Sequence, residues 1–187
     1  MFKRLMFCGM IGLLLAFSVT AQAQVPPVAD PTVVNKVKML LSGYEHFPPP
    51  KTWMALGDQG AKALMVLTLD ETQWPLVRSR SVMALGFYPT EEVKTFLVML
   101  MDYKDRIAPM LRRNAIVSLA SAFGPSAVPI IGKRLSDEDY FVREAAIKNL
   151  AKLGGEQAAT LLTEQRKIEK ERILRENIDV ELKRIKK

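Results

Sequence analysis

Apolar residues recur along this chain with the spacing of helices, and strand-like alternation is scarce. In TVVNKVKMLLSGY, residues 32–44, they form one stripe on a helix wheel. Similar patterns follow in AKALMVLTL, VKTFLVMLM and AVPIIGKRL. Gly and Pro, which end one helix and allow the next to begin, interrupt the patterns at 56–60, 86–92, 123–127 and 153–157. The pattern therefore predicts an all-α protein.

One unit of sequence occurs three times. VRSRSVMALG, LRRNAIVSLA and VREAAIKNLA each place an Arg seven positions before a Leu. Successive arginines are about 31 to 34 residues apart, which leaves room for two helices and two turns and is typical of a helical repeat array. The three pairs are Arg78 with Leu85, Arg112 with Leu119, and Arg143 with Leu150.

The third unit resembles a known family. LSDEDYFVREAAIKNLAKLGGEQAATLL, 135–162, is similar to a HEAT or HEAT-like repeat of the armadillo type, with a first helix, an Asp-containing turn, a second helix opening with Val-Arg and a Leu-Gly stop. The resemblance covers 51–162 and implies a right-handed α-solenoid of about eight or nine helices, whose first unit is an atypical cap. Asp137 lies six residues before Arg143, as in the family pattern, whereas the acids before Arg78 and Arg112 lie eight and seven residues upstream.

The repeat arginines are predicted to be structural. A separation of seven residues returns a helical side chain to within about 20° of the same face, so each Arg points toward the packed side with its Leu. A buried cation needs a counter-ion, and the Asp of the preceding turn is the nearest one in sequence. We therefore expect structural Asp–Arg pairs at Arg78, Arg112 and Arg143, the last with Asp137. The alternative is a row of anion-binding arginines.

The same wheel indicates which side chains of the second helices face outward. In HEAT-like arrays the second helices line the concave, ligand-binding surface, so the resemblance makes these residues a candidate groove. The candidate groove includes Ser79, Ser121, Glu144 and Ala145 besides the binding residues named below. Its cations favour an acidic partner. The expected binding residues are Arg80, Met83, Phe87, Arg113, Asn114, Val117, Lys148 and Lys152.

Residues 164–187 are expected to form a separate charged helix. From Glu156 onward the chain has no Pro and no Gly, which predicts one long C-terminal helix. Its apolar stripe must cover the last repeat, a partner helix or a second copy of the chain, and the basic end could contact anionic lipid weakly. The stripe consists of Leu174, Ile178, Leu182 and Ile185.

The N-terminus reads as an export signal. Residues 1–23 combine a short basic start, an apolar run and an Ala-Gln-Ala cleavage signal, so we expect a signal peptide that is removed after Ala23. An uncleaved membrane anchor is the alternative, although the run is short for a bilayer. Cleavage would remove Cys8, the only Cys, and lower the net charge from +7 to about +5. The chain then divides into an extended linker, 24–32, the repeat domain, 33–163, and the charged helix; the expected location is periplasmic or extracellular.

No catalytic or metal motif is evident. The chain lacks a phosphate-binding loop, a nucleophile elbow and a zinc-protease signature, and His46 is its single His. We expect no cofactor and no metal. The sequence favours a non-catalytic scaffold of the bacterial cell envelope that binds a protein or peptide. The resemblance also admits an enzyme or a nucleic-acid-acting protein, because some HEAT-like relatives are bilin lyases and others DNA glycosylases. Export argues against both of these and against nucleic acid as a partner.

Overall fold

The computed structural model describes residues 27–43 and 47–185. The predicted signal peptide, its cleavage site and His46 lie outside these ranges. Helices fill the described part, and no strand occurs within it. The α-helices are α1 (Pro31–Ser42), α2 (Pro50–Met54), α3 (Gly57–Leu69), α4 (Pro75–Leu85), α5 (Glu91–Asp102), α6 (Pro109–Phe123), α7 (Val128–Gly132), α8 (Tyr140–Leu153), α9 (Gly155–Ile168) and α10 (Arg172–Ile185); two short 3-10 helices, η1 (Gly124–Ala127) and η2 (Lys133–Ser136), flank α7.

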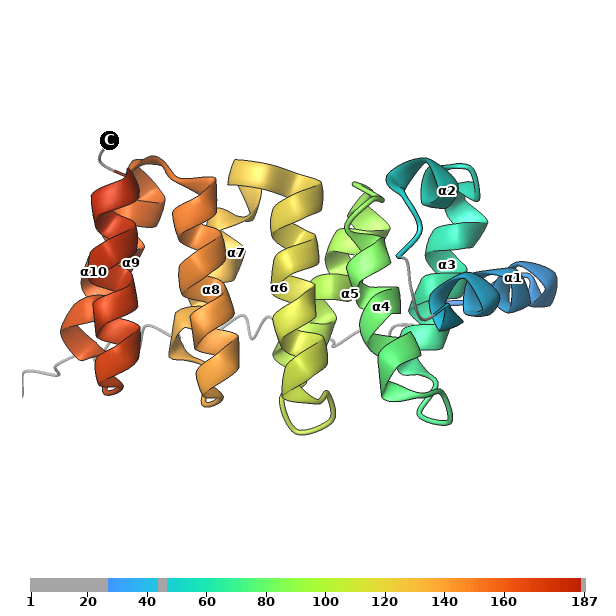
Figure 1. The fold of residues 1–187 in the computed structure, drawn as a ribbon, viewed down its shortest axis with the longest axis horizontal. Coiled ribbons are helices and arrows are strands. Elements are labelled where there is room, and N and C mark those ends of the chain that lie inside the picture. The colour runs from blue at the N-terminus through green and yellow to red at the C-terminus, as the bar shows by residue number, and fades with distance from the viewer. Residues whose placement is uncertain (1–26, 44–46, 186–187) are drawn as a thin grey trace, which may run out of the picture.

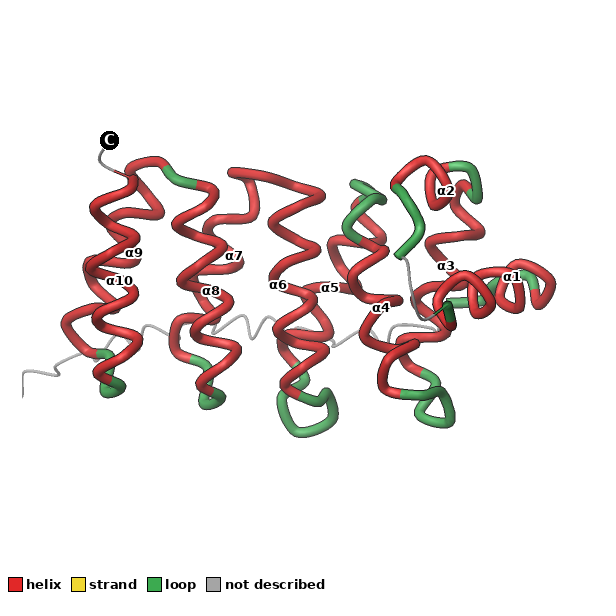
Figure 2. Tube along the Cα trace, viewed as in Figure 1, coloured by secondary structure: helices red, strands yellow, loops and turns green. Residues whose placement is uncertain are grey.

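The helices form an all-α solenoid of successive pairs, as the periodicity predicted. The pairs are α3 with α4, α5 with α6, α7 with α8, and α9 with α10. The second helices α4, α6, α8 and α10 stand side by side and pack on one another along the array, while α1 lies across one end on α3 and α4 (Figure 1). The turns that join the two helices of each pair all lie along one edge, the lower edge in Figure 2.

Local chemistry sets the helix ends. Pro75 and Pro109 begin α4 and α6, where the missing backbone N–H would have had no helical acceptor. The side chain of Asp139 accepts the N–H groups of Phe141 and Val142 and so caps α8. Gly154 ends α8 with a φ of 69°, a conformation that other residues avoid. The Pro and Gly signals of the sequence therefore correspond to real helix boundaries.

The repeated Leu residues are core residues. Leu85, Leu119 and Leu150 are fully buried and belong to one continuous hydrophobic cluster that runs through the array. All three therefore have the same environment at the same place in a second helix. The three sequence copies correspond to three copies of the same structural unit.

The predicted single C-terminal helix is wrong, because the chain turns back between Ile168 and Arg172. Glu169 is buried there, and its carboxylate accepts hydrogen bonds from Arg143, from Gln165 and from the backbone N–H of Glu171. These contacts end α9 without a Gly or Pro, and the boundary placed at residue 164 falls inside α9.

The pair α9–α10 is therefore a fourth repeat. It carries its own Arg and Leu seven positions apart, Arg175 and Leu182. Leu174 and Ile178 are fully buried, and α10 packs on α8 and α9. Of the three surfaces that the apolar stripe could have covered, it covers the last repeat, so it offers no support for self-association through this helix.

One helical stretch in the described ranges, Pro109–Ser136, is long and apolar enough to cross a membrane by length and composition alone. In the fold it consists of α6, η1, α7 and η2, and it bends at Gly124, where φ is 55°. Within this stretch, 44% of the 18-residue segment with the tested hydropathy is buried inside the array. Its apolar side chains include members of the hydrophobic core.

Candidate functional site

Arg112 pairs with an acid of the following repeat. Its side chain is 2% exposed, and Nη2 lies 2.9 Å from Oδ1 of Asp137. Nη1 donates to the carbonyl oxygens of Lys104 and Ile107, in the turn just before α6. The sequence had assigned Asp137 to Arg143, and that pairing is wrong: the carboxylate of Asp137 reaches back to the preceding repeat.

Arg143 repeats this arrangement one unit farther on. Nη1 donates to the carbonyl oxygens of Asp137 and Glu138 in its own turn, and Nε and Nη2 each lie 3.1 Å from a carboxylate oxygen of Glu169. Side chains near a helix start lean back over the preceding turn, so Arg112 and Arg143 each bind their own turn and the acid of the next one. Burial raises the pKa of Glu169, but the bonds from Arg143, the Glu171 N–H and Gln165 together hold that pKa below its ordinary value.

Arg78 departs from the pattern. Its Nε donates to the carbonyl oxygen of Thr68 at 2.9 Å, and no ion pair joins it to a carboxylate of the described residues. The acid before it, Asp70, accepts from Thr72 and Gln73 instead, and these bonds lower the pKa of Asp70. The predicted Asp–Arg pair is thus absent in this repeat.

Two of the expected groove residues hold helices together. Arg80 donates through Nη1 to the carbonyl oxygens of Leu41, at 2.8 Å, and Gly43, and so ties α4 to the end of α1. Asn114 is 7% exposed and donates to Oγ of Ser79 at 2.7 Å, which links α6 to α4. Both side chains are already engaged, so the structure removes them from the candidate binding surface.

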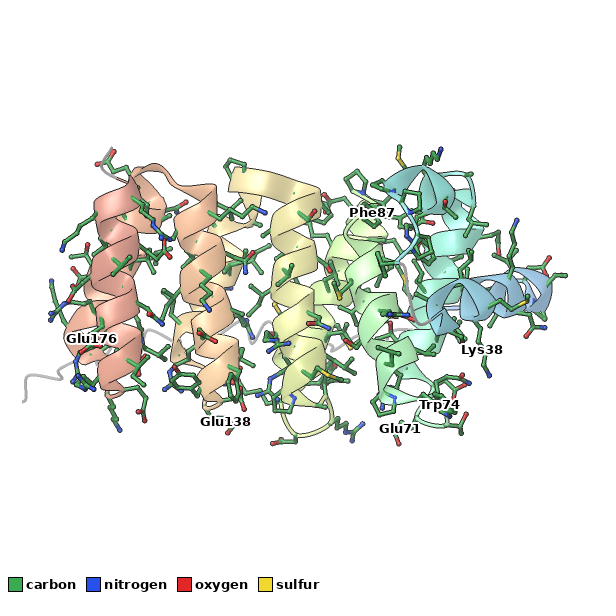
Figure 3. All side chains as sticks on the ribbon, viewed as in Figure 1. Lys38, Glu71, Trp74, Phe87, Glu138 and Glu176 are labelled. Atoms are coloured by element: carbon green, nitrogen blue, oxygen red, sulfur yellow. The ribbon has the colours of Figure 1, made fainter. Side chains whose placement is uncertain are left out.

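Phe87 is also engaged within the fold. It is half-buried, and its ring centroid lies 6.4 Å from that of Phe47. It stands at the opposite end of the α3–α4 pair from Glu71 and Trp74, as Figure 3 shows. Its contacts place it beside the prolines before α2, away from the middle of the second helices.

The other five expected binding residues remain on the surface of the second helices. Met83 is 43% and Val117 41% exposed. Lys148 is exposed but forms an ion pair of 2.7 Å with Glu144. Arg113 and Lys152 are exposed and form no ion pair with the described residues. These side chains lie on α4, α6 and α8, which pack side by side.

A row of exposed apolar side chains on the same face was missed. Each member lies two residues before a repeat Arg, and therefore within about 20° of Met83 and its equivalents on the wheel. The helical wheel could have predicted this row if it had been extended by one turn toward the start of each helix. Recognising the fourth repeat, at Arg175, would have added the fourth residue. The four residues are Leu76, Met110, Phe141 and Ile173, which are 41%, 39%, 55% and 55% exposed. We call this set the apolar row.

Comparison with known families agrees with this geometry. Residues 107–180, from the turn before α6 into α10, match the family model of HEAT repeats. No curated protein sequence matches the chain. The same pairing of helices continues back to α3, outside the matched residues. The chain is thus a helical repeat protein in which residues 107–180 are similar to HEAT repeats, a kind of repeat generally involved in protein interaction.

Proposed function

We propose that this protein is a non-catalytic scaffold that holds a protein or peptide partner on the face of its second helices. The apolar row is the observation that carries the proposal. Isolated exposed apolar residues need no explanation, but here one repeat position is apolar and exposed on four neighbouring helices. Such regularity indicates a binding surface that crosses the array.

The spacing of the apolar row suits a helical partner. Packed helices lie about 8 to 10 Å apart, so the row offers an apolar contact at roughly that interval. An amphipathic helix presents the same face every seven residues, about 10.5 Å along its axis. A partner helix laid across α4, α6, α8 and α10 could therefore contact one member of the row with each second turn.

The charges on this face favour an acidic protein over a nucleic acid. Arg113 and Lys152 are the exposed cations of the predicted groove that have no partner among the described residues, because Lys148 is neutralised by Glu144. Two such cations can steer an acidic segment. A nucleic acid would need a longer series of phosphate contacts, and the apolar row supplies none.

We place this scaffold in the cell envelope, on the support of the export signal at residues 1–23. Cell fractionation followed by N-terminal sequencing tests this part of the proposal. A mature chain that begins at Gln24 in the periplasmic fraction is the expected result. A cytoplasmic protein that begins at Met1 would contradict it.

The binding face is tested by charged substitutions in the apolar row. Met110→Asp with Phe141→Asp should lower capture of the partner at least tenfold, because a carboxylate would have to be buried against apolar side chains. Both positions are exposed, so the melting temperature should change little. The partner is first identified from envelope extract by mass spectrometry, and its affinity is then measured with purified proteins.

Met39→Asp is the matched control. Met39 is 78% exposed but lies on α1, away from the second-helix face. Binding should survive this change. Equal binding by the double variant and the wild type would show that the partner docks elsewhere.

A further inference from the structure

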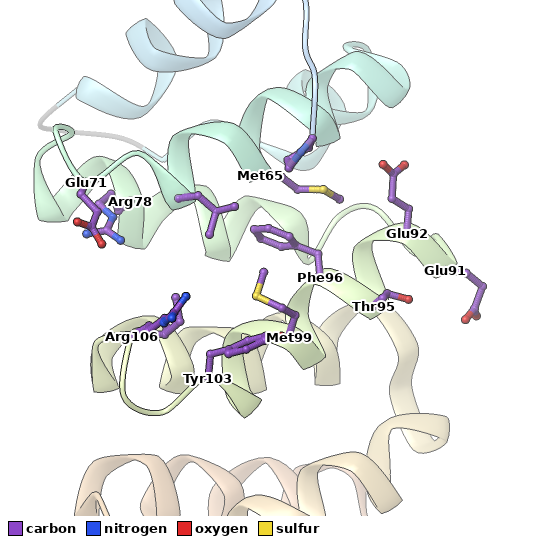
Figure 4. A pocket seen from close by; sticks show the side chains of 13 residues that line it. Met65, Glu71, Arg78, Glu91, Glu92, Thr95, Phe96, Met99, Tyr103 and Arg106 are labelled. Carbon is purple, nitrogen blue, oxygen red and sulfur yellow. The ribbon is translucent and has the colours of Figure 1, made fainter. Parts of the chain in front are cut away.

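A cavity of about 750 Å³ lies on the first-helix side of the array, between α3 and α5 (Figure 4). Its middle is apolar, with Met65 and Leu69 of α3 facing Phe96 and Met99 of α5. None of these residues belongs to the second-helix face. The cavity is therefore a separate surface from the one proposed above.

The two ends of the cavity carry opposite charge. Glu91 and Glu92 line it where α5 begins, whereas Arg78 and Arg106 line it near the end of α5, with Glu71 beside them (Figure 4). The 12 residues of α5 correspond to about 18 Å at 1.5 Å per residue. An extended peptide of five or six residues has that length at about 3.3 Å per residue.

The basic end lacks an acid that the next two repeats possess. The residue directly after the first helix is Asp137 in one repeat and Glu169 in the next, and each pairs with the Arg of the repeat before. The equivalent residue after α5 is Tyr103, which lines the cavity and is 54% exposed. Arg78, the Arg that this position would serve, has no carboxylate partner in the described part of the chain. A half-buried guanidinium therefore faces the cavity without the direct ion pair that its counterparts make, and the nearest acid at this end is the exposed Glu71.

We propose that this cavity binds an extended peptide segment of a partner protein, apolar in its middle, with a carboxylate at Arg78 and a cation toward Glu91 and Glu92. The ligand carboxylate takes the place that Asp137 and Glu169 occupy in the other repeats. Nε of Arg78 is taken by the carbonyl oxygen of Thr68, which leaves its two Nη groups to bind a carboxylate with two hydrogen bonds. A fatty acid could also place a carboxylate at Arg78, but its apolar tail would run toward two glutamates, which favours the peptide.

The test uses synthetic peptides and one substitution at Tyr103. The probes are the fluorescein-labelled, C-terminally amidated hexapeptides Lys-Leu-Phe-Leu-Leu-Glu and Glu-Leu-Leu-Phe-Leu-Lys, which present the two possible directions, and their counterparts with Gln in place of Glu. Fluorescence anisotropy with the protein as purified from its host should show saturable binding of one charged peptide, and at least tenfold weaker binding of its Gln counterpart. Failure of both charged peptides, or equal binding of the Gln forms, would overturn the proposal.

Tyr103→Asp should supply, from the protein itself, the carboxylate that Arg78 lacks. The new carboxylate would pair with Arg78, so peptide binding should fall at least tenfold while the melting temperature rises. Tyr103→Asn, which adds no charge, should leave the binding of the charged peptide within about threefold. Tyr103→Asp binding as tightly as wild type would overturn the proposal, even if its melting temperature rises.

Two further measurements separate this site from the alternatives. The double variant Met110→Asp with Phe141→Asp should bind the peptide as wild type does. Peptide binding in the cavity is therefore tested independently of the partner proposed for the second-helix face. Sodium dodecanoate serves as a competitor. Saturable dodecanoate binding without peptide binding would assign the cavity to a lipid-like carboxylate and reject the peptide.

Discussion

At the scale of residues, buried arginine–acid pairs connect successive repeats. Arg112 and Asp137 are both almost completely buried, and each keeps one atom, Nε and Oδ2 respectively, without a hydrogen-bond partner in the described structure. The two side chains are therefore joined to each other by a single hydrogen bond, from Nη2 to Oδ1, at a buried position. Removing one member leaves the other charge buried without compensation, which is costly.

Asp137→Ala is expected to destabilise the protein by about 3 to 5 kcal/mol, because Arg112 would lose its counter-ion in the core. Denaturant unfolding followed by circular dichroism measures the change. Glu138→Ala is the control: its side chain is 72% exposed and 3.8 Å from Arg112, so it should cost less than about 1 kcal/mol. Equal losses in both variants would contradict the buried-pair interpretation.

The sequence predicted the role of these arginines but not all of their partners. The seven-residue spacing places each Arg on the packed side, and the cost of burying a charge then requires an acid. Proximity in sequence suggested Asp137 for Arg143, whereas Glu169, its true partner, is 26 residues away. Such a contact follows from the stacking of repeats and cannot be deduced from spacing within one repeat. Asn114 and Arg80 were misjudged for the same reason, since their partners lie on other helices.

At the scale of elements, the turn between α9 and α10 shows how tertiary contacts override local propensity. Residues 156–187 contain no Gly or Pro, and local rules therefore extend one helix through them. The fold breaks this helix because Arg143 holds Glu169 inside, while Arg175 donates to the carbonyl oxygens of Glu169 and Lys170. The first three repeats, whose breaks carry Gly or Pro, could be delimited from sequence, and the fourth could not.

The position of α10 should depend on pH through Glu169. Its pKa is lower in the folded protein than its ordinary value of 4.5, so its stabilising effect is complete above that value and is lost as the pH falls through the folded pKa. Hydrogen exchange of residues 172–185 should therefore lose protection in acid earlier than that of α3. Glu169→Gln should lower protection already at neutral pH and weaken this pH dependence. Glu171→Gln, at an exposed position, should behave as wild type does.

At the scale of the whole molecule, stability is expected to be local. Each repeat packs mainly on its neighbours, and α10 packs on α8 and α9. In such arrays, stability is approximately the sum of repeat and neighbour terms. The loss of stability caused by a change in the last repeat should therefore decrease with distance along the array.

Ending the chain after Ile168 tests this locality. The truncation removes the buried Leu174 and Ile178, each worth about 1.5 to 3 kcal/mol of apolar burial, and deprives Arg143 of its acid. Hydrogen exchange should speed up in α8 and α9 and stay unchanged in α3 and α4. Uniform acceleration from α3 onward would indicate a single cooperative unit instead.

The forward reach of the arginines gives the array a direction. Arg112 and Arg143 each find their acid in the unit that follows, so residues 138–169 contain both Arg143 and the Glu169 that neutralises it. A tandem duplication of this segment would give Arg143 a counter-ion in both copies and would leave the junction with Arg175 as it is. A duplicated segment longer or shorter than one repeat would instead displace an acid from its arginine and leave a charge unpaired in the core. The fold thus distinguishes duplications by their length: a copy of one whole repeat lengthens the array, and a copy of another length breaks its series of ion pairs.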